Sequence, residues 1–357
     1  MDGGCPNGSG LDAPGLIVLC FAAVGERTGR RRGLLLVLVL SIIVDACSSP
    51  GASPSSSTTK AGQAAAGTRA PAASAGCSLP AEASVDELGQ NVTVDGVTRS
   101  YLLTTPSSHQ GAPLPVVVDL HGLSESATLE AITTQFSAPA QADGFIVVFP
   151  QGTGNPAGWD VDPGTGAHPN HDIDFMNAIL DKLETHLCVD KSRIYATGLS
   201  DGALFTSLLA CTMADRFAAF APVAGIVMPV PCRPSRPVAI VAFHGTADPI
   251  LPFNGGTAGT TPPPINLHGT GYPANVQAWA VEDGCNPLPT DTQVTIHVIL
   301  RSYRCPTGAA VEFYIVLGGG HAWPGSQLSA TTGPSTFDIN ATDLIWKFFR
   351  QYRLPGS

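Results

Sequence analysis

The stretch that decides the fold reads Ile194-Tyr195-Ala196-Thr197-Gly198-Leu199-Ser200-Asp201-Gly202. Its first four residues predict a buried strand, and residues 203–211 predict a helix. A G-x-S-x-G sequence between a strand and a helix is typical of a sharp elbow that exposes a serine hydroxyl at the carboxyl edge of a sheet. The simpler alternative is a glycine-rich turn that happens to contain a serine. The strand before the turn and the helix after it favour the elbow.

Strands and helices alternate on both sides of this elbow. Residues 92–94 and 101–103, joined by Asp95-Gly96, predict a hairpin. Further strands are expected at residues 115–120, 145–149, 194–197, 219–223, 238–243, 294–299 and 313–316, and helices between residues 120 and 145 and over 172–187, 203–211 and 339–352. Continuous apolar strands are typical of a sheet that helices cover on both faces. The pattern predicts an α/β fold with a doubly wound, mostly parallel sheet in one domain.

A serine hydroxyl is a weak nucleophile, so a functional elbow needs an acid and a histidine base later in the chain. Asp248 follows the strand predicted at residues 238–243, and His321 follows three glycines after the strand predicted at residues 313–316. These residues are the candidate triad. An Asx turn before Pro249 is the alternative role for Asp248. His244 is a competing base, but its place at a strand end suggests a hydrogen bond to loop backbone.

The loop after the strand at residues 115–120 is the expected source of a second oxyanion donor. We assign the oxyanion hole to the backbone N–H groups of Leu123 and Asp201, and we expect the Asp201 carboxylate to point to solvent. His121 and Trp159 are expected to line the substrate site. No C-x-x-C or H-x-x-x-H spacing occurs, so we expect neither a metal nor another cofactor.

Cysteine use indicates an oxidising compartment. Nine cysteines occur, and six lie after residue 76: Cys77, Cys188, Cys211, Cys232, Cys285 and Cys305. An even number favours disulfides over buried free thiols, which remain the alternative. Cys285 and Cys305 flank one predicted strand-turn segment and are the first expected pair.

The N-terminal segment is typical of an export signal. Four arginines precede an apolar run over residues 33–44, which is too short to span a bilayer but suits a signal-peptide core. Val44-Asp45-Ala46-Cys47 resembles a lipobox, except at Asp45, and predicts lipidation of Cys47. An ordinary cleaved signal is the alternative. We divide the chain into a leader over residues 1–46, the lipobox cysteine and a disordered Ser/Pro/Ala-rich linker over residues 47–76, and a catalytic domain over residues 77–357.

Charge and composition exclude several classes of protein. The 357 residues carry 28 acidic and 18 basic groups, which gives a net charge of −10, and only 13% are charged. We therefore expect no nucleic-acid partner. The 39 glycines and 31 prolines exclude a coiled coil. We expect a monomer outside the cell or at its surface, either secreted or held at the membrane through a lipid anchor.

Several segments together resemble one family, the secreted esterases that include extracellular poly(3-hydroxybutyrate) depolymerases, feruloyl esterases and acetyl xylan esterases, with lipoprotein-type members. The matching segments are Asp119-Leu120-His121-Gly122, Cys188-Val189-Asp190, Tyr195 through Gly202, Phe217 through Gly225, His244 through Asp248, Gly319 through Gly325, Asn340-Ala341-Thr342 and Ile345-Trp346. They span nearly the whole predicted domain in order. The family usually has Asn and a second Gly where this chain has Asp201 and Ala203.

The resemblance implies the α/β-hydrolase fold and a triad of Ser200, Asp248 and His321, with Trp323 bordering the site. The expected function is that of an exported serine esterase acting on hydroxybutyrate oligomers, feruloyl esters or acetyl esters through an acyl-enzyme. A peptidase on the same fold is one alternative. The other is an inactive surface lipoprotein that binds a glycan or a polyester.

Overall fold

The computed structural model describes residues 72–80, 84–107, 111–164, 169–257, 264–328 and 333–356. All of them belong to one compact unit, residues 66–357. The predictions for the export signal, for Cys47 and for most of the linker lie outside the described residues. Within the described part of the chain, no helix is both long and apolar enough to cross a membrane.

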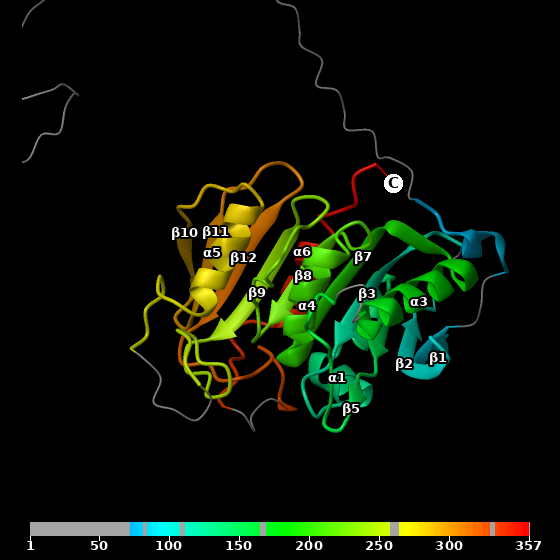
Figure 1. Ribbon diagram of the computed structural model, residues 1–357, viewed down its shortest axis with the longest axis horizontal. Helices are drawn as coiled ribbons and strands as arrows, with labels where there is room; N and C mark the ends of the chain where they lie inside the picture. Colours follow the sequence, from blue (N-terminus) through cyan, green and yellow to red (C-terminus); the bar gives the residue numbers. More distant parts are fainter. Residues whose placement is uncertain are drawn as a thin grey trace, which may run out of the picture. The chain divides into compact units, whose positions relative to one another are not determined.

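A ten-stranded sheet forms the centre of the unit (Figure 1), with the strand order β1-β2-β4-β3-β7-β8-β9-β12-β11-β10. The six strands from β4 to β12 pair in parallel, and both margins pair antiparallel. The strands are β1 (Val85–Val94), β2 (Val97–Thr105), β3 (Leu114–Leu120), β4 (Ile146–Pro150), β7 (Val189–Leu199), β8 (Ala219–Val223), β9 (Ala239–Gly245), β10 (Thr290–Thr295), β11 (Val298–Tyr303) and β12 (Ala310–Val316). The doubly wound, mostly parallel sheet is thereby confirmed. A separate small ribbon consists of β5 (Thr153–Gly154) and β6 (Ala157–Gly158).

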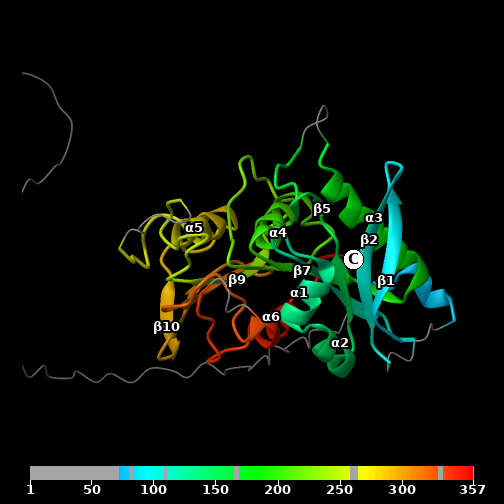
Figure 2. The same cartoon turned by 90° about the horizontal axis from the view of Figure 1, so that it is seen from below.

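Helices cover both faces of the sheet. Figure 2 shows α1, α2 and α6 on one face and α3, α4 and α5 on the other. The helices are α1 (Ala127–Thr134), α2 (Ser137–Asp143), α3 (His171–His186), α4 (Asp201–Thr212), α5 (Tyr272–Glu282) and α6 (Ala341–Phe349), and η1 (Ala75–Ser78) is a short 3-10 turn. Val116 and Val118 pack into the core that includes α3, α4 and α5, whereas Val117 packs into the core of the other face. This explains why the central strands are apolar without interruption.

The structure corrects two predicted elements. The strand expected at residues 294–299 is wrong, because β10 ends at Thr295 and β11 begins at Val298. Ile296 between them is 80% exposed and occupies the turn of a hairpin, so its apolar side chain gave a misleading signal. The single helix expected between residues 120 and 145 is two helices, since Gln135 adopts a left-handed conformation at the end of α1.

The folded domain begins earlier than residue 77. Residues 72–76, which composition places in the linker, contact the strand β7: the Lys191 N–H donates to the Ala72 carbonyl at 2.9 Å, and the Ser74 N–H donates to the Val189 carbonyl at 2.9 Å. Small residues suit this position, because a Cβ on Gly76 would lie 2.2 Å from the Leu187 carbonyl oxygen. The same small-residue composition serves a linker and a close backbone contact, so composition alone could not separate them.

Three disulfides join segments of the described part of the chain. Cys285 and Cys305 form the predicted bridge, which is therefore confirmed. The other two pairs are Cys77–Cys188 and Cys211–Cys232. Disulfides of this number are typical of proteins that fold in an oxidising compartment.

A pair of carboxyl groups is buried between β3 and α1. Asp119 and Glu130 are both fully buried. The Thr134 hydroxyl donates to Asp119 Oδ2 at 2.6 Å, whereas neither oxygen of Glu130 receives a hydrogen bond from the described residues. Burial raises the pKa of both carboxyls, and the charge of Asp119 raises the pKa of Glu130 further. The pair therefore retains a proton at pH values where exposed carboxyls are ionised.

This pair makes stability depend on pH. The folded state binds the proton of this pair more tightly than the unfolded state does. The free energy of unfolding of the protein therefore falls as the pH rises above the ordinary carboxyl range of about 4. A Glu130→Gln variant removes one of the two buried charges and its repulsion with the other, so we expect its Tm at pH 8 to exceed that of the native protein by about 2–4 °C. The gain should be smaller at pH 5. Thermal unfolding at both pH values, with the exposed Asp143→Asn as control, tests this; equal shifts at both pH values would contradict it.

The central topology brings distant loops to one edge. Parallel strands end on the same side of a sheet, so the chain leaves β3, β7, β9 and β12 next to one another. In the pairing of β9 with β12, Gly245 lies opposite Val316. The loops that carry Asp248 and His321 therefore begin side by side, near the turn that holds Ser200.

Candidate active site

Ser200 lies on a sharp turn between β7 and α4. Its backbone has φ 57° and ψ −115°, a conformation that is costly for a residue with a side chain. The Ser200 N–H donates to the Val223 carbonyl at 3.0 Å and holds the turn against the neighbouring strand. A Cβ on Gly202 would lie 2.0 Å from the Leu120 carbonyl oxygen, and one on Gly198 would lie 2.6 Å from the same atom. Both glycines of the motif are thus required by close backbone packing.

Asp248 and His321 form a hydrogen-bonded pair. His321 Nδ1 lies 2.8 Å from Asp248 Oδ2. The other carboxylate oxygen, Oδ1, accepts the backbone N–H groups of Ile250 and Leu251, both at 2.8 Å. Asp248 therefore has both roles that the sequence allowed. Oδ1 accepts the N–H groups of the local turn, and Oδ2 contacts the imidazole.

His244 supports Asp248 from below. Its Nε2 lies 2.8 Å from the Leu251 carbonyl, as its position at a strand end predicted, and also 3.2 Å from Asp248 Oδ2. The ring stacks on Tyr272 with 3.8 Å between centroids. Burial alone would raise the pKa of Asp248, but the hydrogen bonds from His244 and His321 lower it below its usual value. Asp248 is accordingly held as a carboxylate.

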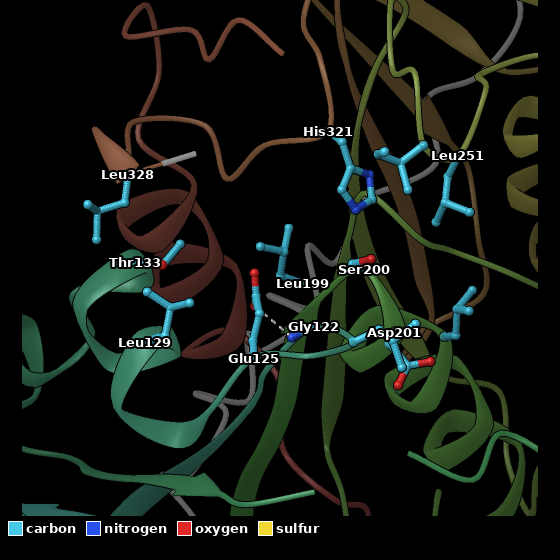
Figure 3. Close-up of a pocket in the computed structure, with 13 residues that line it drawn as sticks. Gly122, Glu125, Leu129, Thr133, Leu199, Ser200, Asp201, Leu251, His321 and Leu328 are labelled. Atoms are coloured by element: carbon cyan, nitrogen blue, oxygen red, sulfur yellow. Dashed lines mark hydrogen bonds between the residues drawn. The ribbon is translucent and has the colours of Figure 1, made fainter. Parts of the chain in front are cut away.

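A cavity of about 550 Å³ opens in front of Ser200. Figure 3 shows the imidazole of His321 directed at Ser200 across the mouth of this pocket. The described lining residues are Gly122, Leu123, Glu125, Leu129, Thr133, Leu199, Ser200, Asp201, Leu204, Ile250, Leu251, His321 and Leu328. The structure thus brings Ser200, His321 and both predicted oxyanion residues to one cavity. Most of the other lining side chains are aliphatic.

Three backbone donors of the loop after β3 already have partners within the protein. The Gly122 N–H donates to Glu125 Oε2 at 2.9 Å. The Ser124 N–H donates to the Ala157 carbonyl at 2.7 Å, and the Glu125 N–H donates to the Gly122 carbonyl at 3.1 Å. The Leu123 N–H makes no hydrogen bond with the described residues. It is therefore the donor of this loop that a ligand in the pocket can use.

The comparisons with known proteins agree with this geometry. The family model described as esterase PHB depolymerase matches residues 99–249. A curated relative, the putative esterase NocK of Nocardia uniformis subsp. tsuyamanensis, is 30% identical over 346 residues, which cover 89% of this chain and 97% of that protein. The chain belongs to the esterase PHB depolymerase family.

Two further proteins, one curated relative and one solved structure, are similar to this chain. Feruloyl esterase B of Piromyces equi is 29% identical over 266 residues, which are 72% of this chain and 46% of that protein. The chain thus spans less than half of that relative. The solved structure of an acetyl xylan esterase from Aspergillus awamori has a TM-score of 0.53 at 16% identity and covers 74% of this chain and 99% of that one. This structural likeness supports the α/β-hydrolase fold.

Two residues expected to line the substrate site are instead buried and support the loops around it. His121 is fully buried, and its Nε2 accepts the Gly152 N–H at 2.9 Å. Trp323 is 1% exposed and donates its indole N–H to the Thr342 hydroxyl at 3.0 Å. Neither is among the described residues that line the pocket. An aromatic side chain next to a site loop can face the core as readily as the site, and both of these rings face the core.

Trp159 and Asp201 also differ from expectation. Trp159 donates its indole N–H to the His121 carbonyl at 2.8 Å and lines a separate cavity of about 340 Å³, beside Leu123 and Asp201. The Asp201 carboxylate does not simply point to solvent, since its Oδ2 accepts the Trp159 N–H at 2.8 Å. Burial raises the pKa of Asp201. The side chain after Ser200 therefore anchors the segment that carries Trp159.

One group of possible metal ligands occurs among the described residues, at Asp95, His171 and Asp174. His171 Nδ1 lies 3.1 Å from Asp95 Oδ2 and 3.9 Å from Asp174 Oδ2, and all three side chains are exposed. None of them lines the Ser200 pocket. The group is an exposed surface cluster, separate from the candidate site.

Proposed function

We propose that the protein is a serine esterase that hydrolyses carboxylic esters through an acyl-enzyme, with Ser200, His321 and Asp248 as its catalytic residues. The observation that carries this proposal is the 2.8 Å hydrogen bond between Asp248 and His321, with the imidazole directed at a serine on a strained elbow (Figure 3). Membership of an esterase family and the aliphatic pocket support the same reaction class.

The geometry fits a two-step acyl transfer. Ser200 Oγ attacks the ester carbonyl carbon while His321 Nε2 takes its proton, and Asp248 holds the Nδ1–H of the resulting imidazolium. The tetrahedral intermediate breaks its bond to the alcohol oxygen, which leaves with the proton from His321. A water molecule then attacks the acyl-enzyme by the same route and regenerates the Ser200 hydroxyl. His244 acts through Asp248, so it is a positioning residue.

The oxyanion hole is assigned to the N–H groups of Leu123 and Asp201. Asp201 begins α4, where the first backbone N–H groups of a helix lack partners within the helix. Neither N–H donates a hydrogen bond within the described part of the chain. Donors that are already aimed at the developing charge stabilise it without reorganising, and each is typically worth about 3 kcal/mol.

The proposed substrates are soluble short or aryl esters and oligomers, including hydroxybutyrate oligomers, feruloyl esters and acetyl esters. A pocket of about 550 Å³ is compatible with acyl groups of this size. We also propose that the protein is exported, either secreted or attached to the membrane through Cys47. The three disulfides support export, because they persist in oxidising compartments.

A fluorophosphonate probe tests the proposed nucleophile. We expect stoichiometric labelling of the native protein, with the modified peptide containing Ser200, because the probe captures only an activated serine hydroxyl. The Ser200→Ala variant should not be labelled. Labelling at another serine, or none at all, would contradict the proposal and favour an inactive binding protein. A p-nitroanilide hydrolysed faster than the matching p-nitrophenyl ester would favour a peptidase.

A further inference from the structure

Two carboxylates lie in a pocket whose other side chains are mostly aliphatic. Glu125 and Asp201 are its acidic residues, and no Lys or Arg is among the described lining residues. The rest of the lining is dominated by leucine and isoleucine side chains. An acyl group in this pocket meets apolar walls and negative charge, and His321 is the one lining residue that can become positive.

Glu125 is held with its charge facing the pocket. The Gly122 N–H donates to Oε2 at 2.9 Å, so the side chain cannot swing away without leaving that donor unpaired. Figure 3 shows the other carboxylate oxygen directed into the cavity, on the side where Leu129, Leu199 and Leu328 lie. Within the described residues this oxygen has no hydrogen bond partner, and no cation neutralises it.

Asp201 is fixed in a similar way on the other side of Ser200 (Figure 3). Its Oδ2 accepts the Trp159 N–H at 2.8 Å. The Asp201 side chain lies close to Gly158. A Cβ at position 158 would lie 2.8 Å from Oδ2, so a larger residue there would displace the carboxylate. Both carboxylates are thus positioned by backbone donors, and both residues line the cavity in front of Ser200.

We propose that Glu125 and Asp201 make this pocket select uncharged acyl groups and reject acyl groups that end in a carboxylate. Like charges a few ångströms apart repel strongly at the effective dielectric of about 20 that applies near protein surfaces. An anionic chain would also lose its hydration against the aliphatic walls without gaining a cationic partner. The inference rests on the proposed esterase function and concerns the acyl side of the same site.

Two esters with the same leaving group and acyl length test this selection. They are p-nitrophenyl valerate, whose acyl chain is neutral, and mono-p-nitrophenyl glutarate, whose chain ends in a carboxylate. The readout is the ratio of their kcat/KM values within each protein at pH 8, so that a change affecting both esters cancels. For the native protein we expect valerate to be preferred by about 100-fold or more.

The variants are Glu125→Gln, Asp201→Asn and the two combined. Each amide keeps an oxygen that can accept the Gly122 or Trp159 N–H while losing the charge. We expect each single variant to lower the ratio about five- to tenfold, and the double variant to lower it further. Asp143→Asn, on the exposed end of α2, is the matched control for a change in net charge and should leave the ratio as it is.

The outcomes separate the two proposals. If both esters are hydrolysed but the double variant keeps a ratio within twofold of the native value, the selection by Glu125 and Asp201 is wrong while the esterase function stands. If the native protein hydrolyses neither ester and the fluorophosphonate probe does not label Ser200, the esterase function fails and this inference fails with it.

Discussion

The Ser200→Ala variant is expected to lose at least about 10⁴-fold in kcat/KM for p-nitrophenyl butyrate. The loss follows because no other hydroxyl takes the place of Ser200 at the turn between β7 and α4, and water would have to attack the ester directly. The Ser200 side chain lines the pocket, so we expect its hydroxyl to be dispensable for the fold. Alanine also meets about the same backbone strain as serine at this positive φ.

Circular dichroism and thermal unfolding should therefore be unchanged in that variant within about 1 °C. The exposed Ser78→Ala serves as control for loss of a serine hydroxyl elsewhere, and it should keep native activity. Activity of the Ser200→Ala variant above about 1% of native, in protein with a native unfolding profile, would assign the reaction to another residue.

Replacing Asp248 with asparagine is expected to lower kcat by about 10³- to 10⁴-fold with little change in KM. The Asn oxygen can keep the N–H groups of Ile250 and Leu251, as Asp248 Oδ1 does now. Its NH₂ group then faces His321 Nδ1, which has to accept that hydrogen bond. The imidazole is thereby forced to carry its proton on Nε2, the atom that must take the proton from Ser200.

An Asp248→Ala variant separates the two uses of this carboxylate. It should be as inactive as Asp248→Asn but less stable by about 1–2 kcal/mol, because the two turn N–H groups lose their acceptor. Steady-state kinetics and urea unfolding of both variants measure the difference. Activity above about 10% of native in the asparagine variant would show that Asp248 does not set the tautomer of His321.

Much of the fold was predictable because it follows local rules. The run from Ile194 to Gly202 encodes a buried strand, a turn that excludes side chains and a helix start, and the structure has all three. The predicted bridge between Cys285 and Cys305 is present. The edge hairpin of β10 and β11 escaped prediction, because an exposed edge strand lacks the continuous apolar signal of the buried strands.

Parts of the candidate site were not predictable, since they depend on which way a side chain faces. His121 and Trp323 lie in the right loops, yet both face the core. Two contacts arise from loop conformations that no spacing rule predicts. They are the second contact of His244, with Asp248, and the hydrogen bond from the Gly122 N–H to Glu125. The short separation of Glu125 from Gly122 was the only available signal, and a spacing of three residues is common in any turn.

By itself, the amino-acid sequence determined the alternating strands and helices, the strained serine turn and the chain order of serine, acid and histidine. These features follow from the local periodicity of apolar residues and from the glycines that a crowded turn requires. The tertiary structure alone decided which loop atoms meet at the edge of the sheet, including the 2.8 Å contact of His321 with Asp248 and the two carboxylates in the pocket. The loops of Asp248 and His321, 73 residues apart in the chain, meet because β9 and β12 pair directly in the assembled sheet, with Gly245 opposite Val316.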